Sequence, residues 1–353
     1  MKNVYVNSVA SISPQETLDN TIFLSETISY NDNVLFALEP NYKEYISPIA
    51  ARRMAKGIKM GVVAAKKAIK EAGANTIEAI IMGTGMGCVR DSERFVSAII
   101  DNQENYLTPT SFIQSTHNTV GGQIALELQC KGYNYTYVQG STSFETALLD
   151  AIMLISSNEN NTVLLGGVDE IGDQTLEFYK KINHVKVEKI ITEELLDSKT
   201  KGAVFSEGAN FFMLSGTKQT STYAEVIDVQ TYNTVTDRIS DVAKQFIETH
   251  ELTTEDIDVV VLGYNGDIDF DFYYDELKSE LFKNTQQVFY KHLSGEFNTT
   301  SAFGFGLALK IIKNQHIPDC VKLNSTVQKP IKKILLYNQY RGNDHSFILL
   351  RQC

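Results

Sequence analysis

Residues 133–155 read YNYTYVQGSTSFETALLDAIMLI, and their pattern predicts a strand, a turn and a helix. Its first part alternates aromatic and polar residues, a pattern typical of a half-buried β-strand. Its second part has apolar residues at helical spacing, namely Phe144, Leu148, Ala151, Ile152 and Ile155. The intervening Gln139-Gly140-Ser141 predicts a sharp turn. A strand, a turn with a small polar residue and a helix form a nucleophile elbow, in which the helix N-terminus directs its amides and positive dipole end at Ser141.

The neighbouring segments continue the alternation of strand and helix. Residues 108–128, TPTSFIQSTHNTVGGQIALEL, predict a polar turn leading into a helix, and residues 161–170, NTVLLGGVDE, predict a buried strand. Apolar spacing between Ala50 and Gly73 predicts a helix that Gly73 ends. Residues 78–88, EAIIMGTGMGC, predict a buried strand and a glycine-rich turn. This turn fits neither GxGxxG nor GxxxxGK[ST], so a tight turn beneath another site is favoured over a phosphate-binding loop.

From about Thr217 the pattern restarts. Residues 222–232 predict a strand, Thr236 to His250 an amphipathic helix, and residues 256–267, DIDVVVLGYNGD, a buried strand. Strand, loop and helix follow, and then two final strands. The order of elements resembles that of the first half. The sequence therefore predicts an α/β fold made of two similar βαβ-type halves, residues 1–216 and residues 217–353, which form one compact pair.

Composition narrows the class of protein. The chain has 353 residues and a net charge of −11, with 32 basic and 43 acidic residues. A duplex-binding protein needs a basic surface, so nucleic acid is not expected as a partner. No uncharged apolar run is long enough to cross a membrane, and the N-terminus has no signal-peptide core. The four cysteines and six histidines are scattered without a metal-binding pattern. We expect a cytoplasmic protein that has reduced thiols and uses neither a metal nor another cofactor.

Motifs along nearly the whole chain resemble the β-ketoacyl synthase family. VYVNSVASISPQ resembles the family's first strand, GTGMGC its glycine turn and STHNTVGGQIALEL the helix before its active-site strand. The nucleophile helix of the family is matched by GSTSFETALLDAIMLI, and the strands that follow it are matched by LLGGVDE and FSEGANFFML. The resemblance implies a thiolase-like five-layer α/β/α/β/α fold with two ketosynthase-like halves. Within this family, the chain is similar to the short, divergent synthase-like proteins of aryl-polyene and flexirubin-type pigment pathways.

The family's catalytic residues are replaced at every matching position. The nucleophilic cysteine falls on Ser141, the first catalytic histidine on Asn265 and the second on Glu296. The lysine of the second histidine motif is retained as Lys291, and Arg341 stands roughly where the gating phenylalanine belongs. His292 lies four residues before the catalytic position and does not replace it. Active members need a thiolate and two histidines for condensation, so these positions are expected to be inactive in this chain.

Three functions remain open. The first is a non-condensing subunit similar to a chain-length factor, which pairs with an active β-ketoacyl synthase and its acyl carrier protein. The family's dimer strand would be residues 134–138, in a homodimer or a heterodimer. The second is an acyltransferase or thioesterase that uses Ser141 as nucleophile, with His292, Glu296 or His117 as base. The third is a weakly active 3-oxoacyl carrier-protein synthase.

Overall fold

The structure is a computed structural model that describes residues 2–22, 24–326 and 330–353. The strands are β1 (Val4–Ile12), β2 (Asn31–Asp32), β3 (Ala79–Gly83), β4 (Tyr133–Tyr137), β5 (Thr162–Asp169), β6 (Ile190–Ile191), β7 (Gly208–Ser215), β8 (Ala224–Tyr232), β9 (Val259–Leu262), β10 (Gln286–Phe289), β11 (Lys333–Tyr340) and β12 (Asn343–Arg351). The helices are α1 (Pro48–Ala51), α2 (Lys56–Ala72), α3 (Val89–Asp101), α4 (Pro109–Gln114), α5 (Thr119–Leu128), α6 (Ser143–Ser156), α7 (Asp173–Lys181), α8 (Ile239–Glu248), α9 (Phe272–Glu276), α10 (Lys291–Ser294) and α11 (Ser301–Asn314). Short helical turns supplement these elements, among them η3 (Gly140–Thr142).

Both halves arrange five strands in the same way. In the first half the strands lie in the order β4-β3-β5-β7-β1, and in the second half in the order β10-β9-β11-β12-β8. In each half, the second, third and fourth of the five strands in sequence run parallel to one another. The fifth strand pairs antiparallel with the first. This identical order confirms the prediction of two similar halves. Whether they count as two domains divided after residue 216 stays a prediction.

The two halves are joined through their first strands. The five strands of each half form one β layer, and β1 and β8 pair antiparallel at Val4↔Val226, Tyr5↔Glu225 and Val6↔Ala224. Backbone hydrogen bonds therefore connect all ten long strands into one strongly bent sheet. This connection is possible because β1 uses one edge for β7 and has its other edge available for β8.

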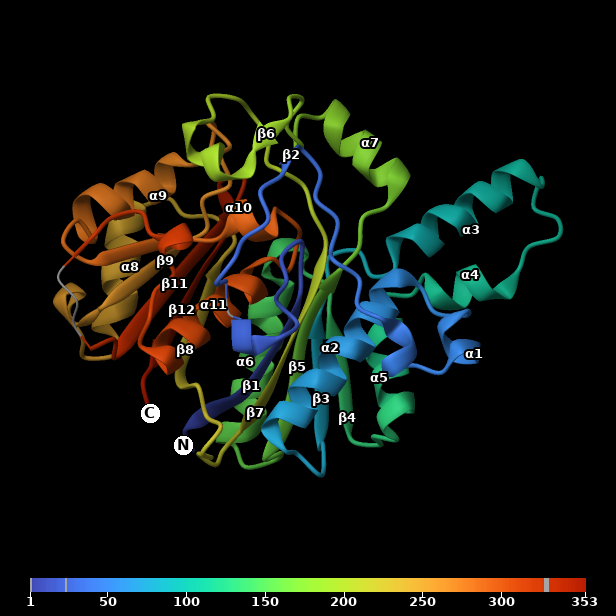
Figure 1. Cartoon of the computed structure of the whole chain (residues 1–353), viewed down its shortest axis with the longest axis horizontal. Coiled ribbons are helices and arrows are strands. Elements are labelled where there is room, and N and C mark those ends of the chain that lie inside the picture. Colours follow the sequence, from blue (N-terminus) through green and yellow to red (C-terminus); the bar gives the residue numbers. More distant parts are fainter. Residues whose placement is uncertain (1, 23, 327–329) are drawn as a thin grey trace.

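Helices cover both outer faces of the β layers and lie between them (Figure 1), and three large clusters of apolar side chains fill the spaces between the layers. The central core contains α6 and α11 together with one face of the strands of both halves. A second core packs α2 and α5 on the outer face of the first half, and a third packs α8 and α9 on the outer face of the second. Successive strand residues point to opposite faces, so Ile81 lies in the central core and Ile80 in an outer core. The result is the expected α/β/α/β/α order of layers.

The helix expected between Ala50 and Gly73 is divided in two. The turn α1 ends before Arg52, and α2 begins at Lys56, after Ala55. Gly73 ends α2 as predicted, with φ of 61° and an N–H that bonds to the carbonyls of the last turn. Within the described residues, no helix combines the length and the apolar character needed to span a bilayer.

Candidate functional site

The predicted elbow forms at the junction of β4 and α6. After Tyr137 the chain leaves the strand, turns through η3 and enters the 14-residue helix α6. Gly140 has φ of 56°, a left-handed conformation that is costly for residues with a Cβ atom. The Ser143 hydroxyl accepts the Gln139 N–H at 2.9 Å and donates to the Gly140 carbonyl at 2.7 Å. These bonds fix the turn, so that Ser141 lies buried directly before the first turn of α6.

Ser141 is hydrogen bonded to a residue that sequence analysis did not select. Its Oγ donates to Asp344 Oδ2 at 2.7 Å. Asp344 follows the two-residue turn Arg341-Gly342, which joins β11 to β12 and has φ of 52° and 76° at its two residues. The Asn233 side chain donates to Asp344 Oδ1 at 3.0 Å, and the Asp344 N–H donates to the Asn233 carbonyl at 2.9 Å. A carboxylate of the second half therefore lies beside the elbow of the first.

The other three predicted site residues form a separate cluster. Lys291 Nζ donates to Glu296 Oε2 at 2.7 Å, and Asn265 Nδ2 donates to the same oxygen at 2.7 Å. Lys291 and Glu296 are an ion pair whose side chains are 0% and 6% exposed. Among the hydrogen bonds of the described residues, none joins Ser141 to this cluster. The structure thus brings Asn265, Lys291 and Glu296 together, while the Ser141 hydroxyl bonds elsewhere. Their roles stay predictions.

Charged residues hold the loop that carries Asn265. The Asp271 carboxylate accepts the N–H groups of Asn265 and Gly266, at 3.3 and 2.9 Å, and burial raises the pKa of Asp271 to about 7. Lys186 Nζ donates to the Gly266 carbonyl at 2.7 Å from below the loop, and burial lowers the pKa of Lys186. The Asn265 loop is therefore fixed from two sides.

Arg341 links the β11–β12 turn to the same loop. Its guanidinium donates to Asp267 Oδ2 at 3.1 Å and lies over the Phe270 ring, 4.9 Å from the ring centroid. Tyr340 and Asn343, on either side of the turn, are paired across the two strands. A two-residue turn with this pairing is a rigid hairpin. Arg341, at the family's gating position, therefore joins the β11–β12 turn to the Asn265 loop through a salt bridge.

A buried carboxyl group connects helix α6 to the cluster. Glu145 lies one helical turn after Ser141, is fully buried, and accepts the Ser346 hydroxyl at 2.9 Å. Burial raises the pKa of Glu145, while the nearby charge of Lys291 acts in the opposite direction. Helix α6 therefore carries a buried carboxyl group that interacts with the charge of Lys291.

Two histidines were considered as bases for Ser141, and neither is bonded to it. His292 stacks on Phe289 with ring centroids 4.0 Å apart, and burial lowers the pKa of its imidazole to about 4. His292 is therefore neutral near pH 7 and lies within an aromatic contact. His117 is exposed in the turn before α5. In the described residues, the base-like group in hydrogen-bonding contact with Ser141 is Asp344.

The glycine-rich turn after β3 has its amides occupied by protein. Asp169, at the end of β5, accepts the N–H of Gly85 at 2.8 Å and that of Met86 at 3.4 Å. The same carboxylate accepts the N–H and the hydroxyl of Thr299, at 2.9 and 2.8 Å. Because the Asp169 carboxylate already accepts these N–H groups, the turn connects the first half to Thr299 of the second half. This agrees with the interpretation of the segment as a tight turn and not as a phosphate-binding loop.

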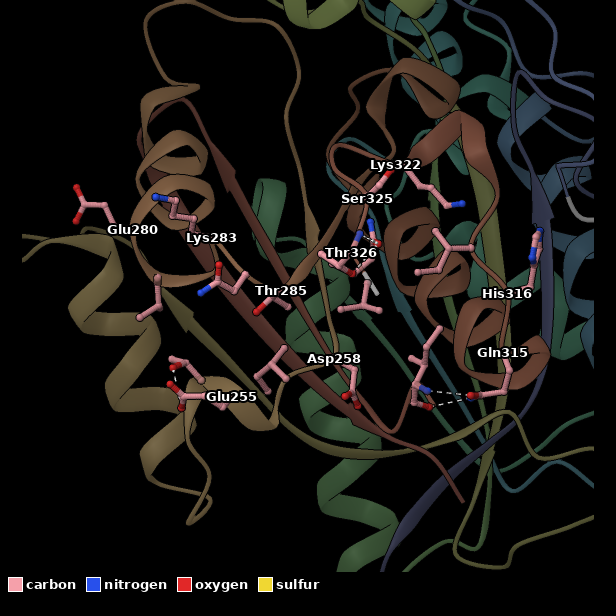
Figure 2. A pocket seen from close by; sticks show the side chains of 18 residues that line it. Glu255, Asp258, Glu280, Lys283, Thr285, Gln315, His316, Lys322, Ser325 and Thr326 are labelled. Carbon is pink, nitrogen blue, oxygen red and sulfur yellow. Dashed lines mark hydrogen bonds between the residues drawn. The ribbon is translucent and has the colours of Figure 1, made fainter. Parts of the chain in front are cut away.

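A cavity of about 540 Å³ lies at the opposite end of the second half (Figure 2). Its wall includes Asp258 before β9, Thr285 before β10 and His316 after α11. Asn265 and Lys291 follow the carboxyl ends of those strands, whereas this cavity lies at their amino ends. Thr326 and Ile331, on its wall, flank residues 327–329, which lie outside the described residues. The cavity is therefore separate from the candidate site.

Comparison with known proteins identifies the family. The family model "Beta-ketoacyl synthase, N-terminal domain" matches residues 32–220, which is more than half of the chain. The chain belongs to the β-ketoacyl synthase family. No curated protein matches it by sequence.

Solved structures of the same fold cover the whole chain. The ishigamide ketosynthase/chain length factor is 15% identical with a TM-score of 0.84, and the two chains are covered to 100% and 99%. A β-ketoacyl synthase from Burkholderia phymatum STM815 is 14% identical with a TM-score of 0.82 and full coverage of both chains. The ketosynthase ApeO in complex with its chain length factor ApeC, from Xenorhabdus doucetiae, is 13% identical with a TM-score of 0.77, covering 100% of this chain and 98% of that one. These likenesses confirm the predicted thiolase-like fold.

Sequence analysis missed Asp344, Asp271 and Glu145. Glu145 carried a signal, since it lies on the apolar face of a helix four residues after the candidate nucleophile. Asp344 carried none, because it is 203 residues away from Ser141 and only the tertiary structure brings it near.

Proposed function

We propose that the protein is a non-condensing subunit of fatty acid or polyketide biosynthesis, similar to a chain-length factor and of the aryl-polyene type. It would pair with an active β-ketoacyl synthase in the cytoplasm. The observation that carries the proposal is the buried contact of Glu296 with Lys291 and Asn265, at the positions where active family members are expected to have two histidines.

The chemistry of condensation explains why this contact matters. Decarboxylation and condensation of a malonyl group need donors that stabilise an enolate. The carboxylate of Glu296 opposes such a negative charge, and its ion pair occupies the cation of Lys291. Asn265 can donate a hydrogen bond but cannot shuttle a proton near neutral pH. The site therefore lacks the acid-base groups of a condensing enzyme.

Pairing is supported by the edge strand β4. It is the last strand on its side of the sheet, so one row of its backbone groups has no strand partner among the residues that the structure describes. Tyr135 and Val138 are 51% and 42% exposed, and Met153 on the adjoining helix α6 is 62% exposed. An apolar edge of this kind favours association with another chain. We infer a homodimer when the protein is expressed alone and a heterodimer with the synthase.

The names of similar structures agree with these partners. One is a ketosynthase with its chain length factor, and another, AntDE:AntF, is a ketosynthase in complex with a type II polyketide acyl-carrier protein at 13% identity. By analogy we propose a synthase subunit and an acyl carrier protein as the partners of this chain.

Co-purification and light scattering test the pairing. Tyr135→Asp should weaken dimerisation at least tenfold, since it places a charge on the apolar edge, whereas Phe178→Asp, on the exposed face of α7, should leave it unchanged. The wild type should also show no malonyl decarboxylation or condensation when no synthase is present. A monomeric wild type at micromolar concentration, or condensation by the protein alone, would refute the proposal.

The weakly active synthase is the less supported alternative, because all three catalytic positions are substituted. The Ser141 acyltransferase or thioesterase has a specific observation in its favour, the bond between Ser141 and Asp344.

A further inference from the structure

Ser141, Asp344 and Asn233 form a chain of hydrogen bonds that links the elbow to the second half. We propose that this chain is an acyl-transfer site in which Ser141 accepts an acyl group from a thioester and Asp344 acts as general base. This activity goes beyond the non-condensing role, because no carbon–carbon bond is formed.

The geometry is that of an activated nucleophile. Ser141 Oγ donates to Asp344 Oδ2 at 2.7 Å, within the range at which a base can remove a hydroxyl proton. Asp344 is in turn oriented by Asn233, whose side chain donates to Oδ1 and whose carbonyl accepts the Asp344 N–H. A nucleophile, a base in hydrogen-bond contact and a third group that orients the base are the diagnostic arrangement for covalent catalysis.

Asp344 is better placed to act as the base than the three residues that the sequence suggested. His292 is neutral and stacked on Phe289, His117 is exposed in another turn, and Glu296 is paired with Lys291. Asp344 itself has a left-handed backbone with φ of 50°, which is uncommon for a residue other than glycine. The bonds to Asn233 hold the carboxylate toward Ser141 in spite of this conformation.

The proposed step conserves atoms and charge. Ser141 Oγ attacks the thioester carbonyl carbon as its proton moves to the Asp344 carboxylate. The carbon–sulfur bond then breaks, and Asp344 returns the proton to the leaving sulfur, which departs as a free thiol. The products are an ester on Ser141, a free thiol and an ionised Asp344, which can then take a proton from water or from another thiol as that group attacks the ester.

The same carboxylate selects the substrate. An acyl chain that ends in a carboxylate would place a second negative charge near Asp344. Lys291 would not compensate this charge, because it is already paired with Glu296. We therefore assign neutral acyl thioesters as the substrate class, in preference to malonyl thioesters.

The test uses the full-length protein, a fluorophosphonate probe and decanoyl-N-acetylcysteamine as the thioester. We expect both reagents to modify Ser141, as located by peptide mass mapping, with no modification in Ser141→Ala. Asp344→Asn should slow acylation about 10²- to 10⁴-fold, the usual contribution of a general base. Asp173→Asn, which removes an exposed carboxylate on α7, should leave the rate unchanged.

Asn233 is a positioning residue, so Asn233→Ala should lower the rate at saturating thioester without changing KM. This variant also keeps the proposal testable if Asp344→Asn fails to fold. Absence of modification at Ser141 in the wild type, or acylation of Asp344→Asn at the wild-type rate, would overturn the proposal. Pairing with the synthase is measured on the same variants. A protein that pairs but is not acylated refutes only this inference, whereas one that is acylated but does not pair refutes only the proposed function.

Discussion

Replacement of Glu296 by Gln should destabilise the protein strongly. The change removes the negative partner of Lys291, whose ammonium group is fully buried and only 2.7 Å from the carboxylate. Removing one member of a buried ion pair leaves an uncompensated charge and typically costs about 3–5 kcal/mol. Unfolding entropy is about 2.1 cal/mol/K per residue, or about 0.7 kcal/mol/K for this chain length. The expected decrease in Tm is therefore about 4–7 °C, measurable by scanning calorimetry or circular dichroism.

Two control variants separate the ion pair from other causes. The double variant Lys291→Met with Glu296→Leu should recover most of the lost stability, because buried pairs can be replaced by apolar residues at little cost. Glu177→Gln breaks the exposed pair of Glu177 with Lys180 and should change stability by less than about 1 kcal/mol. If Glu296→Gln stays within about 0.5 kcal/mol of the wild type, or the double variant is no more stable than the single one, the reasoning is wrong.

Three further outcomes are expected. His292 has a pKa of about 4 in the folded protein against 6.5 when unfolded. The neutral imidazole therefore stabilises the protein fully above pH 6.5, and the free energy of unfolding decreases by up to about 3 kcal/mol as the pH falls toward 4. In urea titrations, His292→Leu should reduce this dependence of the free energy of unfolding on pH. Neither Ser141→Cys alone nor its combination with Asn265→His should give malonyl condensation in a carrier-protein assay, because the catalytic parts act as a unit, and turnover by either variant would contradict this. Asp169→Asn should lower the free energy of unfolding by about 1.5–3 kcal/mol through lost bonds to the glycine turn and Thr299, and unchanged chemical denaturation would show that these bonds contribute little.

The elements of the fold were predictable where the local pattern was strong. The helix after Ser141 and the strand β9 have periodic or continuous apolar residues, and both appear in the structure at the expected places. Helix α8 is shorter than the predicted Thr236 to His250, since it begins at Ile239 and ends at Glu248. The joining of β1 to β8 was not predictable, because an edge-to-edge pairing leaves no periodic signal in either strand.

The candidate site was predictable only as far as the family motifs reach. Resemblance identified Asn265, Lys291 and Glu296, which the structure brings into hydrogen-bonding contact. Resemblance also selected Ser141 but gave no indication of its partner. Asp344 is 203 residues from Ser141 in the chain, so its position beside the hydroxyl depended on tertiary structure alone.

The double pairing of β1 has a consequence for synthesis of the chain on the ribosome. Tyr5 pairs with Ser215 on one side and with Glu225 on the other, so the first strand to be made waits for partners more than 200 residues later. At about 5–20 residues per second, this interval lasts about 10–40 s. During that time a segment that is almost entirely buried in the folded protein has neither of its partner strands, and contacts of such long sequence separation form slowly. We expect the nascent chain to depend on chaperones until β7 and β8 have left the exit tunnel.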